Sequence, residues 1–287
     1  MVCPICSEVA VARFFRKDGR WLLICRLCRH VFWENFPSRD ELAAYYAQQY
    51  TSIHSQETIQ TSSRDYYRSH LAELLRIGKT PLKKAAILDY GCSIPVLLAE
   101  ARQMGFRDAI GVDYSKESKQ YGSEQGVAVI SPEQLRDIPD GSLDIARFSH
   151  TLEHSIDPGA VLGEVVSKIR PGGLVYITQP NFPVFRYAES PLDLKDTVYP
   201  EHLHFFSPIS LAEMSSRRNL EIQILFSHQN ESVVAAAYSA MLDPEYARER
   251  MAGYASRGDS FFPDLANYPH YTCENSVLYA FRPKPCG

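Results

Sequence analysis

Apolar and polar positions follow a repeating order through the middle of the chain. Short apolar runs predict strands, and they cover residues 85–89, 109–113, 127–130, 143–149 and 174–178. Amphipathic spacing between these runs predicts helices over residues 96–104, 115–122 and 158–169. Strands that alternate with helices in this way favour an α/β fold built on a doubly wound, mainly parallel sheet. A ligand of such a sheet is expected at the carboxyl ends of its strands.

The pattern changes on both sides of this central region and predicts three parts. Residues 1–36 form a small module with one strand-like run at 20–24, and residues 37–84 form a connector with helices at about 38–46 and 64–77. Residues 85–287 form the main domain, which ends with strands at 220–225 and 276–281. An insertion at about residues 228–274 separates these two strands, and it contains a helical stretch at 233–241.

Four cysteines in the first 28 residues form two Cys-x-x-Cys pairs, Cys3 with Cys6 and Cys25 with Cys28. Two such pairs at this separation can place four thiolates around one Zn²⁺, which closes its coordination shell. The sequence therefore predicts a structural zinc ribbon. Free or redox-active cysteines are the alternative, and His30 could replace one thiolate.

Composition narrows the function classes. The 287 residues carry 30 Lys and Arg against 34 Asp and Glu, a net charge of −4, which provides no general attraction for nucleic acid. No apolar stretch approaches the roughly 18 to 20 residues of a membrane span, and the first residues do not resemble an export signal. We expect a cytoplasmic protein without a membrane partner.

The turns after the first two predicted strands of the sheet carry the first functional signal. Gly91 lets a ligand approach the backbone, and Asp113, about twenty residues on, can accept both hydroxyls of a ribose. An adenosyl cofactor is therefore expected. Ser93 and Val96 stand where a dinucleotide fingerprint needs glycine, which disfavours a nicotinamide cofactor, and a turn without any ligand is the remaining alternative. The candidate cofactor residues are Asp89, Gly91, Cys92, Ser93, Asp113, Tyr114 and His150.

Residues 85–227 resemble the class I S-adenosylmethionine-dependent methyltransferases, whose fold is Rossmann-like. The resemblance is carried by Ile-Leu-Asp-Tyr-Gly at 87–91, Gly-Val-Asp at 111–113, Leu-Glu-His at 152–154 and Arg-Pro-Gly-Gly-Leu at 170–174. It implies S-adenosylmethionine as cofactor and a methyl acceptor as substrate.

The N-terminal part narrows the resemblance to zinc-ribbon methyltransferases of modified sugars and natural products. Their sugar C-methyltransferases carry a Tyr-x-Glu-His segment after the fifth strand, which residues 199–202 match. The resemblance implies that His202 is the catalytic base, and that Glu201 and Tyr199 are substrate-site groups. We expect a small-molecule acceptor, with the methylated atom left open. A polar entry to the following helix is the alternative interpretation of residues 201–204.

Residues 150–154 read His-Thr-Leu-Glu-His, which is also a zinc-peptidase pattern. That chemistry needs both histidines on one helical face, whereas His150 ends a predicted strand. We therefore expect His150 to line the site as a further candidate catalytic residue, and Glu153 and His154 to brace the loop that follows.

Two other functions stay open at this point. An RNA methyltransferase could hold its substrate through the basic ribbon, although the negative net charge argues against a nucleic-acid partner. A noncatalytic binding protein could keep the fold, because Ser93 and Pro95 depart from the usual glycine-rich turn. The sequence leaves the oligomeric state open.

Overall fold

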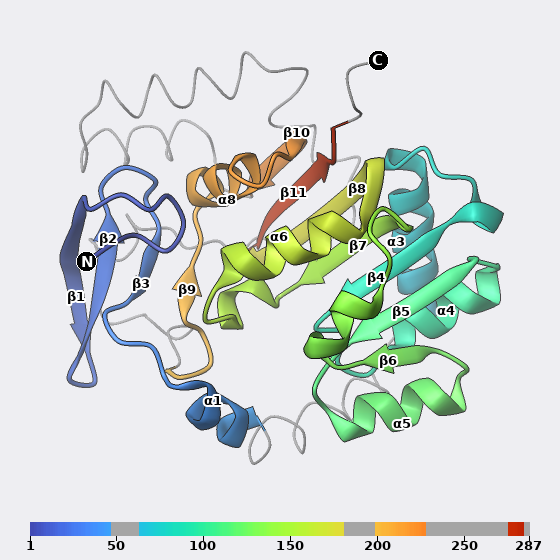
Figure 1. Ribbon diagram of the computed structural model, residues 1–287, viewed down its shortest axis with the longest axis horizontal. Coiled ribbons are helices and arrows are strands. Elements are labelled where there is room, and N and C mark those ends of the chain that lie inside the picture. The colour runs from blue at the N-terminus through green and yellow to red at the C-terminus, as the bar shows by residue number, and fades with distance from the viewer. Residues whose placement is uncertain (47–62, 181–198, 228–274, 284–287) are drawn as a thin grey trace. The chain divides into compact units, whose positions relative to one another are not determined.

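The computed structural model describes residues 1–46, 63–180, 199–227 and 275–283 (Figure 1). Contacts within the chain define two compact units. The first contains residues 1–36, 152–159 and 178–279, and the second contains residues 37–151, 160–177 and 280–287. Most of the predicted insertion, including its helical stretch at 233–241, lies outside the described residues. No helix among the described residues is long and apolar enough to cross a membrane.

The second unit is built on parallel strands in the order β8-β7-β4-β5-β6. Strand β4 pairs in parallel with both β5 and β7, and β5 pairs in parallel with β6. The strands are β4 (Ala86–Tyr90), β5 (Asp108–Val112), β6 (Ala128–Ile130), β7 (Leu143–Ser149) and β8 (Ile169–Pro180). The predicted α/β fold with a mainly parallel sheet is confirmed.

Helices flank this sheet on both faces (Figure 1). They are α3 (Arg64–Ile77), α4 (Val96–Met104), α5 (Lys116–Glu124) and α6 (Pro158–Lys168), and α1 (Arg39–Tyr45) precedes them. Because both faces are covered, the central strands are buried nearly throughout, and Ile87, Leu88 and Ile145 are inaccessible to solvent. Side chains of Ser63 and Ser115 cap α3 and α5, and Gly105 ends α4 with a left-handed φ of 97°.

Strand β8 begins five residues earlier than the pattern predicts. The Pro-Gly-Gly at residues 171–173 signals a loop, yet this stretch is hydrogen-bonded as strand. The Gly172 amide donates to the Arg282 carbonyl at 2.7 Å, and the Arg282 amide donates to the Gly173 carbonyl at 3.1 Å. A tertiary backbone partner therefore overrides the local turn signal, and α6 ends at Lys168.

The first unit contains a four-stranded sheet in the order β1-β2-β3-β9. Its strands are β1 (Val11–Lys17), β2 (Arg20–Cys25), β3 (Val31–Trp33) and β9 (His204–Phe205), and successive pairs are antiparallel. Only β2 is predicted from the sequence. The 3-10 turn η4 (Leu152–His154) and helix α8 (Pro208–Ser216) belong to the same unit. Strands β10 (Glu221–Ser227) and β11 (Asn275–Phe281) follow β8 in the order β10-β11-β8.

Candidate active site

The turn after β4 is tight and closely packed. The amides of Gly91 and Cys92 both donate to the Val112 carbonyl, at 2.8 and 3.2 Å. Gly91 has a φ of +73°, and a Cβ placed there would lie 2.4 Å from Cγ2 of Thr151. Only glycine fits this position, so the backbone at the carboxyl end of β4 is not covered by a side chain of its own.

Asp113 follows β5 at the same edge of the sheet. Its Oδ2 accepts the Ser93 amide at 2.9 Å and its Oδ1 accepts the Ser115 amide at 2.8 Å. Burial raises the pKa of Asp113, and these two amides oppose that shift. Each carboxylate oxygen keeps further acceptor capacity. The Asp113 side chain is therefore held rigidly and can still accept hydrogen bonds from a ligand.

Asp89, one residue before the end of β4, forms a buried ion pair. Nη1 of Arg147 donates to Oδ1 and Oδ2 of Asp89 at 2.8 and 2.9 Å. The Asp89 side chain is 3% exposed and the Arg147 side chain is 13% exposed. Burial raises the pKa of Asp89, which Arg147 opposes. Burial alone would lower the pKa of Arg147, but the charge and hydrogen bonds of Asp89, together with the nearby Tyr176 and Tyr66, outweigh it and raise that pKa. Nε of Arg147 is buried and has no hydrogen-bond partner among the described residues.

The other candidate cofactor residues lie in different environments. The Cys92 thiol is buried, 3.5 Å from the Ser118 hydroxyl. Burial, followed by the charges of Asp113 and Asp89, raises the pKa of this thiol well above its usual range. Tyr114 is 68% exposed, and its hydroxyl donates to Glu133 at 3.3 Å. His150 is exposed, directly follows β7 and has a left-handed φ of 52°.

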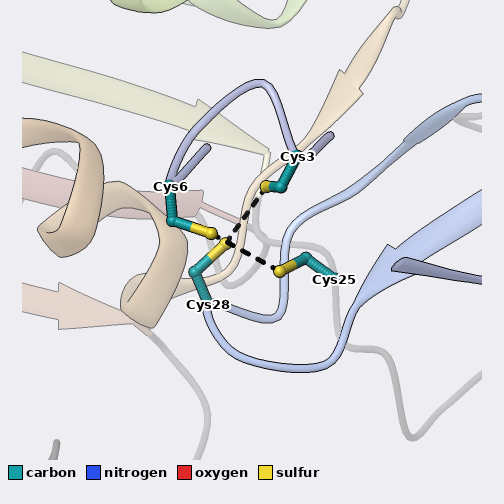
Figure 2. A group of neighbouring side chains, drawn as sticks. All are labelled: Cys3, Cys6, Cys25 and Cys28. Atoms are coloured by element: carbon teal, nitrogen blue, oxygen red, sulfur yellow. Dashed lines mark hydrogen bonds between the residues drawn. The ribbon is translucent and has the colours of Figure 1, made fainter. Parts of the chain in front are cut away.

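The four N-terminal cysteines converge in the first unit (Figure 2). All four are buried, and their sulfur atoms lie within 4.8 Å of one another. The sulfurs of Cys3 and Cys28 are 3.5 Å apart, as are those of Cys6 and Cys25. Four thiolates at the usual Zn–S distance of 2.3 Å would be about 3.8 Å apart in a tetrahedron. The residues therefore fit a closed, structural zinc site.

His30 is not part of this group. It is fully buried, and its Nε2 lies 2.9 Å from Nδ1 of His204 on the neighbouring strand β9. Burial lowers the pKa of both imidazoles, that of His204 to about 4. One imidazole donates a hydrogen bond to the other, so His30 is engaged with His204 and the four thiolates remain the fitting ligand set.

The segment that contains Tyr199, Glu201 and His202 is attached to the ribbon. Arg20 stacks over the Tyr199 ring at 4.1 Å, and Trp33 contacts the same ring edge-on at 5.5 Å. Nε1 of Trp33 donates to the His202 carbonyl at 2.8 Å. Residues 201–204 are thus more than a polar entry to α8, because they lead into β9.

His202 meets two residues that the sequence assigns only a bracing role. Its ring contacts the His154 ring edge-on at 4.9 Å, and Nδ1 of His154 is 2.9 Å from the Glu201 carbonyl. The Glu153 carbonyl accepts the Leu203 amide at 2.8 Å. Glu153 is buried, and one of its carboxylate oxygens lies within 4.8 Å of a ring nitrogen of His154 and of a ring nitrogen of His202.

The sequence predicts that His150 and His154 do not share a helical face, and the structure agrees. His150 directly follows β7, and His154 ends the 3-10 turn η4. They also belong to different units, since His150 lies in the second and His154 in the first. The zinc-peptidase interpretation of residues 150–154 therefore has no geometric basis.

Sequence reasoning does not find Arg147, Thr151 or the convergence of Glu153 with His202. Arg147 has a signal that could reveal it, because it is a charged residue within a mainly apolar strand, which also contains Asp144. Thr151 hydrogen-bonds the Tyr90 carbonyl at 3.1 Å and packs where a Gly91 side chain would lie. Glu153 and His202 are 49 positions apart, and no local pattern links residues at such a separation.

Comparison with known proteins gives a consistent family. A family model described as a methyltransferase domain matches residues 62–224. The ubiquinone biosynthesis O-methyltransferase of Bordetella avium is 29% identical over 155 residues, which are 49% of this chain and 64% of that protein. The protein of the same name from Thiobacillus denitrificans is 27% identical over 161 residues, 51% of this chain and 69% of that protein. The chain therefore spans less than two thirds of the Bordetella avium relative.

A solved structure shares the fold at larger coverage. It is a chain from the complex between the Haloferax volcanii Trm112 methyltransferase activator and a methyltransferase, with a TM-score of 0.51 and 17% identity. The match covers 88% of this chain and 100% of that chain. At this identity the likeness supports the fold alone.

Proposed function

This chain belongs to the methyltransferase-domain family, and we propose that it is an enzyme that methylates a small molecule with S-adenosylmethionine as donor. The observation that carries the proposal is the arrangement at the carboxyl ends of β4 and β5. There, Gly91 forms a tight turn of positive φ that packs against Thr151, and Asp113 presents a fixed carboxylate. These are the features that an adenosine ribose requires at the edge of a parallel sheet.

The chain's own residues suggest how the cofactor would be held. Asp113 would accept the ribose hydroxyls, and the Gly91 turn would pass close to the cofactor. When bound, S-adenosylmethionine supplies an electrophilic methyl group on a sulfonium. Asp89 and Arg147 carry opposite charges side by side, which suits the ammonium and carboxylate of an α-amino acid. The Nε–H of Arg147, which has no partner among the described residues, is a donor available for that carboxylate.

The acceptor is a hydroxylated small molecule in this proposal. The curated relatives are named O-methyltransferases, and an oxygen acceptor must lose its proton when it is methylated. We assign the control of that proton to His202, in a substrate site that includes Glu201 and Tyr199. A sugar or another natural-product intermediate is the acceptor that the resemblance of residues 199–202 to the Tyr-x-Glu-His segment of sugar methyltransferases favours. The zinc ribbon would have a structural role.

The ribbon's basic residues support a small molecule over RNA. Arg13 pairs with Glu34 at 2.9 Å and lies 5.2 Å from the centre of the Trp21 ring. Arg16 also lies over Trp21, at 5.9 Å, and Arg20 lies over Tyr199. Guanidinium groups engaged with the protein's own rings and carboxylate are less available to phosphates.

Calorimetric titration of zinc-loaded protein with S-adenosylhomocysteine tests the cofactor assignment. Asp113→Ala should weaken binding about 10- to 100-fold, because a hydrogen bond to a charged group contributes about 1.5–3 kcal/mol. Asp108→Ala is the matched control, since Asp108 is an exposed carboxylate at the opposite end of the same strand. Absence of binding to the wild type would favour the noncatalytic alternative, and equal affinity in Asp113→Ala would remove Asp113 from the site.

Turnover tests the acceptor side. With labelled S-adenosylmethionine and a panel of hydroxylated sugars, nucleotide-sugars and phenols, His202→Ala should lose methyl transfer to any acceptor that the wild type uses. Its affinity for S-adenosylhomocysteine should stay within a few-fold of the wild type. Unchanged turnover in this variant would exclude His202 from the mechanism.

A further inference from the structure

Three metal-ligating side chains from two distant parts of the sequence meet in the first unit. Glu153 and His154 belong to the turn η4, and His202 lies shortly before β9. One oxygen of Glu153 and one ring nitrogen from each histidine lie within 4.8 Å of one another. None of these residues belongs to the four-cysteine group, so they form a separate cluster, which we call the Glu-His-His cluster.

The Glu153 carboxylate is held in the protein interior. Its side chain is 3% exposed, and Oε1 lies 4.0 Å from Nε2 of His154. The Leu203 amide bonds to the Glu153 carbonyl, which fixes the η4 turn against the residue that follows His202. A buried carboxylate requires positive charge or hydrogen-bond donors nearby, and a bound cation is one way to provide the charge.

The hydrogen bond of His154 fixes which of its nitrogens can bind a metal. The Glu201 carbonyl, 2.9 Å from Nδ1, can only accept, so Nδ1 carries the proton. In a neutral imidazole the lone pair is then on Nε2, the nitrogen that faces Glu153. Histidines that bind metals in proteins usually donate their other N–H to a carbonyl or carboxylate in this way.

We propose that Glu153, His154 and His202 bind a divalent transition-metal ion of the zinc type. Two imidazole nitrogens and one carboxylate oxygen are the donor set that such ions accept, whereas Mg²⁺ and Ca²⁺ prefer oxygen ligands alone. Three protein ligands leave at least one coordination position open. That distinguishes this cluster from the four-cysteine group, which closes the shell of its ion.

A metal at this position deepens the proposed function, and this part of the inference rests on it. An acceptor hydroxyl that replaces a water on the metal becomes more acidic and loses its proton to bulk water, which leaves an alkoxide for methylation. With the metal bound, His202 controls the acceptor proton as a ligand of the ion and does not take the proton itself. Acceptors with two neighbouring oxygens, such as vicinal diols or catechols, would chelate the open positions.

Metal content of the whole 287-residue chain tests the cluster without any substrate. The reduced protein is equilibrated with buffered Zn²⁺ and analysed by elemental mass spectrometry. The wild type should hold two ions per chain, and His202→Asn and Glu153→Gln should each hold one. The second-site dissociation constant should rise more than about 100-fold, since even outer-shell partners of a metal contribute about 10- to 100-fold. Glu201→Gln is the matched control and should keep two ions, because its carboxylate is not part of the cluster.

Co²⁺ substitution shows which site is lost and whether the variant folds. Co²⁺ bound to four thiolates gives an intense sulfur-to-metal charge-transfer band, which should persist in every variant as a sign of an intact ribbon. Co²⁺ in the Glu-His-His cluster should add weaker visible bands without that charge-transfer feature, and these should vanish in His202→Asn. Should Glu153→Gln lose the thiolate band, His202→Asn decides the test, because His202 is only half-buried.

One ion in the wild type would overturn the proposal, and Glu153, His154 and His202 would then be metal-free neighbours, with His202 as an uncoordinated base. A second ion that survives in both variants would equally overturn it. Failure of the proposed function appears separately, as absence of S-adenosylhomocysteine binding in calorimetry on the same samples, and it would leave the metal count readable.

Discussion

Replacing Arg147 by methionine should destabilise the second unit, because the change leaves the Asp89 carboxylate buried without its cation. Nη1 of Arg147 makes two hydrogen bonds to this carboxylate, at 2.8 and 2.9 Å. At 2.8 Å and an effective dielectric constant of about 20, the attraction between the charges amounts to about 6 kcal/mol. Desolvation of both groups offsets part of it. Removing one partner of a buried pair generally costs about 3–5 kcal/mol, which is the loss we expect in the free energy of unfolding.

Urea denaturation of three variants gives the measurement. The double variant with Asp89→Asn should recover much of the loss, since no buried charge remains unpaired. Asp108→Asn is the matched control, because it removes one charge from the pair of Arg107 and Asp108, in which both side chains are about half exposed. Such surface pairs contribute about 0–1 kcal/mol.

The dependence of this loss on pH has a definite sign. Burial raises the pKa of Asp89 in the folded protein, and Arg147 holds it down in part. Without Arg147 that pKa should rise further above its unfolded value, so the folded variant takes up a proton more readily than the unfolded chain. The deficit should therefore be largest above the raised pKa and shrink as the pH falls through it. A deficit below about 1 kcal/mol at neutral pH, or one that grows on acidification, would refute the reasoning.

Three further outcomes are expected. Chelation of zinc, or Cys25→Ser, should shift the tryptophan fluorescence to longer wavelength, because both tryptophans of the chain lie in the ribbon strands; Cys92→Ser should not. Gly91→Ala should destabilise the protein by at least about 1–2 kcal/mol in a thermal or urea melt, because residue 91 has a positive φ and the added Cβ would meet Thr151. The double variant with Thr151→Ser should recover part of this loss, and an unchanged melt of Gly91→Ala would contradict the packing. Cys92 should resist alkylation at mildly alkaline pH in peptide mass mapping, because its thiol is buried and its pKa is raised; rapid modification of the native protein would contradict this.

The central parallel strands could be predicted from the sequence because they are largely buried on both faces. Such strands are written as mainly apolar runs, which β4 and β5 follow closely and which β7 follows apart from Asp144 and Arg147. The start of β8 could not be predicted, because its Pro-Gly-Gly adopts strand geometry only with a backbone partner more than a hundred positions away. Strand β9 has two residues and likewise exists only by pairing with β3.

The candidate site also contains one part that could be predicted from the sequence and other parts that could not. The closeness of Gly91 and Asp113 follows from the order of the elements, since parallel strands that are neighbours end at the same edge. The Asp89–Arg147 pair depends on the register between β4 and β7, which apolar patterning does not specify residue by residue. The Glu-His-His cluster depends on a tertiary contact between η4 and residues 201–203, and local propensity contains no information about it.

The connection between the ribbon and His202 gives the N-terminal module a physical role. Residues 199–203 are not part of a helix or strand, so their position depends on partners elsewhere in the first unit. Trp33 of the ribbon strand β3 bonds the His202 carbonyl at 2.8 Å, and the Glu153 carbonyl bonds the Leu203 amide at 2.8 Å. His202 is thereby held from two sides. A module this small usually needs metal to fold, so zinc on the four cysteines would stabilise the strand on which the position of His202 depends. In the proposed function, the module would therefore support the geometry of the acceptor site without having to touch the substrate.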